Sequence, residues 1–94
     1  MIPKNLSKEH LIKAIDEISN LGIRKGRHSS TYDVVYKNEK YPPKLIVSIA
    51  NRFANGEELN PNDFSGGEGT DCFKLLEDNG FEIIKKTIII IKYA

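Results

Sequence analysis

A cluster of cationic side chains marks a short stretch in the first third of the sequence. Three basic residues and a histidine fall within five positions: Arg24, Lys25, Arg27 and His28. Ser29 follows them directly. Basic and small hydroxyl side chains are the usual donors to the phosphate oxygens of nucleic acids. The basic loop, residues 23–30, is therefore predicted to contact phosphates, although a merely solubilising loop would have the same composition.

Two further features could contact an anion. Residues 65–70 read Ser-Gly-Gly-Glu-Gly-Thr but lack the Gly-Lys-Ser/Thr ending with which a nucleotide P-loop reaches the terminal phosphates. This stretch predicts a tight structural loop that leads into a helix, with an anion contact through Gly66 and Gly67 as the alternative. Lys44, at the predicted start of another helix, is a further candidate for a phosphate contact.

Residues that could perform catalysis or hold a metal are few. His10 and His28 do not have metal-ligand spacing, and the single cysteine, Cys72, allows no intramolecular disulfide and no Cys-rich metal site. His10 is expected to be a solvated helix residue. Cys72 is expected to be a small buried hydrophobe, because a nucleophilic thiol needs a base that the sequence does not identify. We therefore predict that the chain is not an enzyme and has no catalytic residue, metal or cofactor.

Length and composition limit the remaining classes. A chain of 94 residues is expected to form one domain, 1–94, and its 39% hydrophobic and 29% charged residues are typical of a globular protein. The net charge of +1 does not by itself indicate a nucleic-acid partner. The N-terminus lacks a signal peptide, and the longest apolar run, Ile88–Ile91, is too short to span a membrane. A cytoplasmic protein with no membrane contact is expected.

Three helices are predicted, at residues 8–20, 43–54 and 71–78. Ser7 and Thr70 have the side chains to cap the first and the third. Apolar residues recur at helical spacing in the second helix and are expected to form its buried face: Leu45, Ile46, Ile49, Ala50 and Phe53.

Short strands are predicted at residues 31–36, from Tyr41, and at residues 81–84, because β-branched and aromatic residues are enriched there. Residues 37–40 are expected to form a hairpin turn, and Ile88–Ile91 to extend the last strand or form another. The order is α-β-β-α-α-β. It predicts an α+β fold with a small antiparallel sheet of about three strands packed with three helices. The pattern leaves open whether the domain closes like a winged helix.

Several local motifs together resemble a known family, and they lie at residues 22–27, 31–36, 40–44, 50–56, 64–67 and 79–81. The series resembles the small N-terminal head domain of multidomain bacterial restriction proteins. These include HNH endonucleases and the AAA+ GTPases of modification-dependent (Mcr-type) systems. The Tyr-Pro-Pro-Lys and Phe-Ser-Gly-Gly pieces are the most specific, and the resemblance covers residues 7 to 85. It implies a DNA-sensing role beside a nuclease or AAA+ domain in the same chain or operon.

We therefore expect a non-catalytic recognition module of a restriction or defence system that binds DNA, either as a fragment or as a free-standing homologue. The predicted DNA-contacting residues are Arg24, Lys25, Arg27, His28, Ser29, Lys44, Gly66 and Gly67. The alternative is a protein-interaction or assembly module with no nucleic-acid contact. It would dock a nuclease or motor, or form a homodimer through the apolar Ile88–Ile91 segment.

Overall fold

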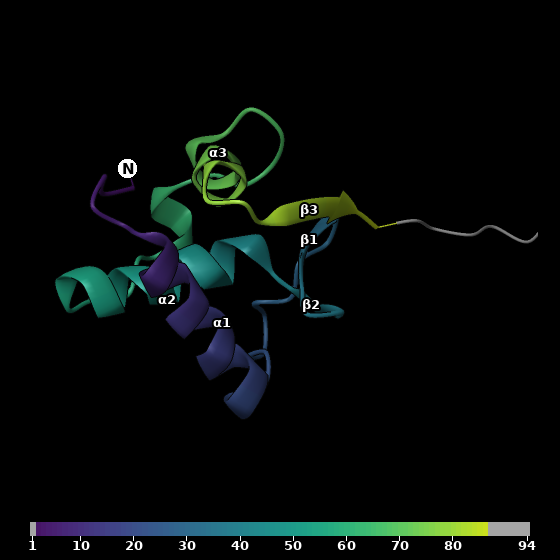
Figure 1. The fold of residues 1–94 in the computed structure, drawn as a ribbon, viewed down its shortest axis with the longest axis horizontal. Helices are drawn as coiled ribbons and strands as arrows, with labels where there is room; N and C mark the ends of the chain where they lie inside the picture. The colour runs from purple at the N-terminus through teal and green to yellow at the C-terminus, as the bar shows by residue number, and fades with distance from the viewer. Residues whose placement is uncertain (1, 87–94) are drawn as a thin grey trace, which may run out of the picture.

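The fold is seen in a computed structural model, which describes residues 2–86. Within these residues it contains three α-helices, one 3-10 turn and one three-stranded antiparallel sheet, in the order α1, β1, β2, α2, η1, α3, β3 (Figure 1). The expected α+β architecture and its α-β-β-α-α-β order are confirmed. The Ile88–Ile91 segment, predicted to be a strand and an interface, lies outside the described residues.

Helix α1 (Lys8–Leu21) starts at a reciprocal cap. The Ser7 hydroxyl accepts a hydrogen bond from the His10 backbone N–H (3.3 Å), and His10 Nδ1 accepts one from the Ser7 N–H (3.0 Å). This is the capping-box arrangement with histidine in the position usually held by glutamate or glutamine. His10 is thus a partly exposed residue of the helix whose ring also pairs with an amide that the helix leaves without a partner.

Helix α2 (Pro43–Asn55) is the most buried element of the fold, with every residue from Leu45 to Asn51 inside. Helix α1 packs across it, and α3, η1 and β1 also contact it. Phe53, predicted to face the core, is 42% exposed, and the Arg52 guanidinium lies over its ring at 5.2 Å. Other residues of the same turn do contact the rest of the domain, since Arg52 pairs with Glu17 of α1 and Ala54 packs against the core. Helical spacing alone therefore placed Phe53 wrongly.

Strands β1 (Tyr32–Tyr36), β2 (Glu39–Tyr41) and β3 (Glu82–Lys85) pair in the order β2-β1-β3. Lys37 and Asn38 join β1 to β2 and both have positive φ angles, 50° and 67°. Two consecutive left-handed residues are the signature of a type I′ turn, whose twist matches that of a hairpin. The turn is therefore two residues long, shorter than predicted, because β2 begins directly after it.

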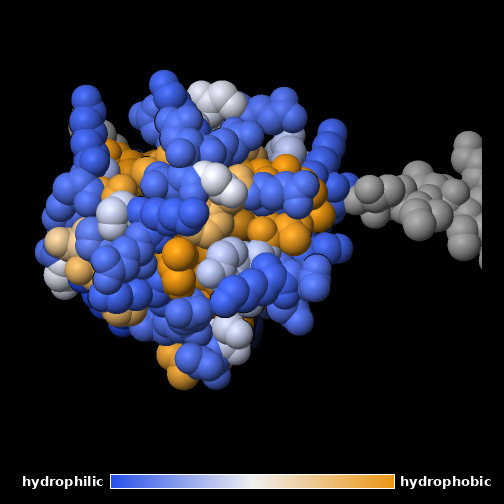
Figure 2. Space-filling view, in the orientation of Figure 1, coloured by the Kyte–Doolittle hydropathy of each residue, from blue (hydrophilic) through white to orange (hydrophobic). Residues whose placement is uncertain are grey.

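One face of the sheet packs on the helices. Val34 in β1 is fully buried. The neighbouring ring of Tyr32 meets Phe73 edge-on at 5.1 Å between ring centroids, and Tyr36 lies 5.8 Å from Phe81. Tyrosines that pack in this way anchor the sheet to the segments at both ends of α3. Figure 2 shows that hydrophobic surface is visible on one side of the molecule as patches between hydrophilic residues.

Helix α3 (Asp71–Asp78) has the predicted bounds. The Thr70 hydroxyl accepts a hydrogen bond from the Phe73 N–H (3.5 Å), as expected of an N-cap. Before it, the single 3-10 turn η1 (Pro61–Asp63) is capped by Asn60. Cys72 is fully buried, which confirms its interpretation as a core residue, and burial raises the pKa of its thiol to about 12.

The α1 cap can be tested by Ser7→Ala, which removes the acceptor for the His10 amide. We expect the free energy of unfolding to fall by about 1 kcal/mol, the usual cost of losing a serine N-cap. Urea denaturation followed by circular dichroism measures it. Ser19→Ala is the matched control, because Ser19 is exposed inside the same helix and alanine favours helix. Equal effects of the two substitutions would contradict the cap.

The Cys72 thiol is expected to be unreactive in the folded protein at pH 8. The thiolate is the reactive form, and the raised pKa keeps its population low at this pH. Burial of the side chain also prevents the reagent from reaching the sulfur. Labelling with Ellman's reagent should be slow in buffer and fast in denaturant. Fast labelling of the native protein would show that α3 opens readily or that Cys72 is not in the core.

Candidate nucleic-acid interface

A tight turn shapes the basic loop. The Arg27 N–H donates to the Arg24 carbonyl (3.0 Å), and Gly26, at the third position of this turn, has a φ of 77°. A positive φ at that position favours glycine, because other residues pay a steric cost there. The turn leaves Lys25 exposed at its tip and places Arg24 and Arg27 on either side.

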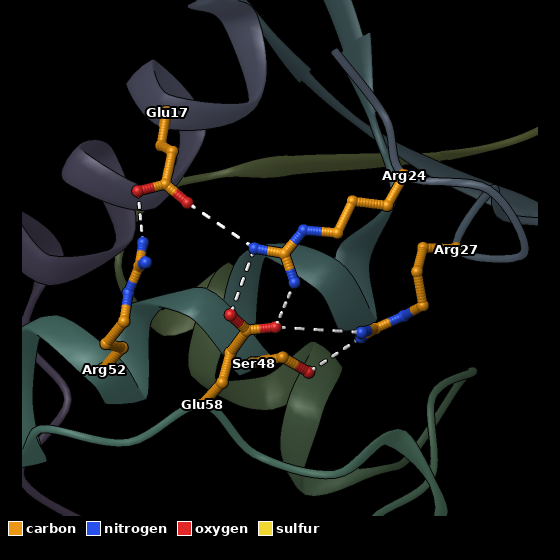
Figure 3. A network of polar contacts seen from close by, with 6 residues as sticks. All are labelled: Glu17, Arg24, Arg27, Ser48, Arg52 and Glu58. Atoms are coloured by element: carbon orange, nitrogen blue, oxygen red, sulfur yellow. Dashed lines mark hydrogen bonds and ion pairs between the residues drawn. The ribbon is translucent and has the colours of Figure 1, made fainter. Parts of the chain in front are cut away.

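Both arginines bind carboxylates of the protein itself (Figure 3). Arg24 pairs with both oxygens of Glu58, with one contact of 3.1 Å, and lies 3.7 Å from Glu17 of α1. Arg27 donates to the Ser48 hydroxyl of α2 (3.0 Å) and lies 4.0 Å from Glu58. The basic loop is therefore held against α1, α2 and the segment after α2 by its own cations.

Glu58 is the common partner in this network. The hydrogen bond from Arg24 holds the pKa of the Glu58 carboxyl below its ordinary value, against an opposing effect of burial. The same bond raises the pKa of Arg24, whereas burial lowers the pKa of Arg27. Glu17 is also shared, since it binds Arg52 as well as Arg24. Three arginines thus share two glutamates, and one positive charge remains on the cluster.

Next to this network lies an open groove of about 620 Å³, here called the basic groove. Residues 26–32, 42–44, 61–62 and 65–67, together with Phe73, line it. Six of the eight predicted DNA-contacting residues are among them: Arg27, His28, Ser29, Lys44, Gly66 and Gly67. Arg24 and Lys25 are not. Segments that are far apart in the sequence, and that were proposed separately, therefore form one surface.

Lys44 connects two walls of the basic groove. Its ammonium group donates to the Pro61 carbonyl of η1 (2.6 Å) and lies 5.0 Å from the centre of the Phe64 ring. A Cβ atom on Gly66 would lie only 3.0 Å from Lys44 Cγ. Glycine thus lets the 65–67 loop approach Lys44 closely, and a larger residue there would require the lysine side chain to shift.

Several polar side chains in the groove have no partner. His28, Ser30, Thr31, Asn62 and Ser65 make no side-chain hydrogen bond or ion pair with any of residues 2–86. Ser29 differs, because its hydroxyl donates to Asp33 (2.5 Å). Asn62 and Ser65 are not among the residues predicted to contact DNA. Asn60 before Pro61 indicates a turn in the sequence, but it does not show in which direction the side chains of that turn point.

Other kinds of site find no support in the part of the chain that the structure describes. Residues 2–86 contain no group of three or more His, Cys, Asp or Glu side chains that could hold a metal ion. No helix among them is both long and apolar enough to cross a bilayer.

The chain matches a protein-family model. A family model described as "ScoMcrA-like, N-terminal head domain" matches residues 4–85. This confirms the resemblance to the head domains of restriction proteins that the local motifs indicated. No curated protein and no solved structure matches the chain.

The role of Glu58 can be tested by Glu58→Gln, with Glu57→Gln as a neighbouring control whose side chain is exposed. We expect the first substitution to lower the free energy of unfolding by about 1 kcal/mol at pH 7, because two arginines lose their charged partner. Denaturant titrations of both variants measure this.

The difference in the free energy of unfolding between the wild type and Glu58→Gln is expected to depend on pH. Because the folded-state pKa of Glu58 is depressed, its contribution is present above the ordinary value of 4.5 and is lost as the pH falls through the folded pKa. The difference between the wild-type protein and Glu58→Gln should therefore shrink below about pH 4.5 and vanish at lower pH. A difference that persists unchanged into acid would contradict the charged pairing.

Proposed function

The chain belongs to the family of ScoMcrA-like N-terminal head domains, and on that premise we propose that it is a non-catalytic, DNA-binding module of a restriction or defence system. The observation that carries this proposal is the basic groove. Six candidate residues from three separate segments line it together. A loop that served only to increase solubility would not need to line a groove together with Lys44 and the 65–67 loop, which come from other parts of the chain.

The chemistry of the groove suits a phosphodiester ligand. Arg27 and Lys44 supply fixed positive charge, and the His28 ring and the hydroxyls of Ser30 and Thr31 supply unpaired hydrogen-bonding groups. Cations and small hydroxyls of this kind are the usual phosphate partners. Arg24 has another role in this proposal, since it fixes the loop through Glu58 and does not line the groove.

The module would act beside a catalytic partner. A nuclease or AAA+ domain in the same chain or operon would perform the reaction, and the head domain would bring it to DNA. The affinity of the module alone is expected to be modest, because the groove offers fixed cations for only one or two phosphates.

Lys44→Gln is the direct test. Fluorescence polarisation with a labelled duplex should show an affinity about three- to tenfold lower than that of the wild type. The slope of log affinity against log salt should also be smaller by about 1, because one phosphate contact is lost. The matched control is Lys13→Gln, which removes the same charge from exposed α1 outside the groove and should change neither quantity.

Two results would count against the proposal. The first is the absence of detectable binding to any DNA at low salt. The second is an equal loss of affinity in Lys44→Gln and Lys13→Gln, which would indicate general charge attraction. The first result would favour the assembly module as the function.

A further inference from the structure

The size of the basic groove limits what it can hold. Protein pockets for small ligands enclose roughly 300–1,000 Å³, and the groove, at about 620 Å³, lies within that range. A surface that binds duplex backbone needs a row of cations along successive phosphates. Among the described residues that line the groove, only Arg27 and Lys44 carry fixed positive charge. Its dimensions and charge therefore fit one nucleotide unit better than a stretch of duplex.

Flat apolar rings form another part of the lining. Three prolines, Pro42, Pro43 and Pro61, lie there together with Tyr32 and Phe73. Nucleobases stack on aromatic side chains whatever their sequence, because every base presents a π face. A duplex does not expose these faces, since its bases are stacked on one another. An unstacked base could therefore pack against this apolar lining while its phosphate contacts the neighbouring cations.

Tyr32 is held in place before any ligand arrives. Its ring packs edge-on against Phe73, with an interplanar angle of 88°, and its hydroxyl donates to Glu68 (2.9 Å). A ring fixed at both ends loses little conformational entropy when a base packs on it. The bond to Glu68 also ties the glycine-rich loop to β1.

Segments of the lining other than the basic loop offer groups that could read a base edge. Asn62 and Ser65 line the groove and have no hydrogen-bond partner for their side chains among residues 2–86. A primary amide presents a donor and an acceptor side by side, which matches the paired donor and acceptor of a base edge. These neutral groups lie in segments distinct from the cationic Arg27.

We propose that the basic groove receives a single unpaired nucleotide, either extruded from a duplex or in a single strand. The base lies among Tyr32 and the prolines with its edge towards Asn62 and Ser65, and its phosphate lies near Arg27 and His28. This inference rests on the proposed DNA-binding function. It adds that the recognised unit is an unstacked nucleotide.

Three probes of one sequence test the inference by fluorescence polarisation: a perfect duplex, the same duplex with one bulged nucleotide, and that duplex with an abasic bulge. Unstacking a paired base costs a few kcal/mol, whereas a bulged nucleotide is already unpaired and needs less free energy to leave the stack. The bulged duplex should therefore bind about tenfold tighter or more than the perfect one. The abasic bulge should bind no better than the perfect duplex.

Substitutions link this preference to the groove. Asn62→Ala should reduce the affinity for the bulged duplex about fivefold or more, and leave that for the perfect duplex unchanged. Asn20→Ala, an exposed site on α1, is the matched control and should have no effect. Tyr32→Leu should reduce the preference further, and if it fails to fold, Asn62→Ala alone decides.

The outcomes separate the inference from the proposed function. Equal binding of all three probes would overturn the inference and leave DNA binding standing. A bulge preference that survives Asn62→Ala would place the nucleotide elsewhere and also overturn it. No binding to any probe would remove both proposals.

Discussion

The burial of helix α2 constrains most of the domain. Its residues from Leu45 to Asn51 are inside, and two of them, Ser48 and Asn51, are polar. A buried polar group without a partner is costly, so each must find one. The Ser48 hydroxyl accepts from Arg27 and its carbonyl from the Leu59 N–H, while the Asn51 amide donates to the Glu57 carbonyl. These bonds determine where the basic loop and the segment after α2 lie.

The basic loop thereby acquires two kinds of cation. Arg24 is committed to Glu58 in a paired hydrogen bond, which orients the loop. Arg27 is partly committed, yet it also lines the groove. Two cationic residues close together in sequence thus have different roles: Arg24 stabilises the fold, whereas Arg27 also faces the groove in which a ligand could bind. The division follows from side-chain direction around the turn at Gly26 and cannot be recognised from composition.

Local chemistry explains which structural expectations were right. The Ser7 and Thr70 caps and the bounds of α3 all depend on bonds within a few residues. Phe53 shows the limit of this reasoning. Its spacing from Ile49 suits a buried face, but exposure depends on which side chains the neighbouring elements cover, and Phe53 is left exposed. The pairing of the His10 ring with the Ser7 amide likewise follows from local geometry that the residue type alone does not reveal.

By itself, the sequence determined the helices, the strands and the family motifs, because caps, turns and apolar spacing act over short distances along the chain. It also identified six of the sixteen described residues that line the groove. Only the tertiary structure decided that Arg27, Lys44 and Gly66 share one groove while Arg24 is bound to Glu58 outside it. These contacts join residues 17 to 39 positions apart in the chain, and they depend on how α2, η1 and the loops pack together. No local signal encodes such proximity, because it arises only when segments distant in sequence pack together.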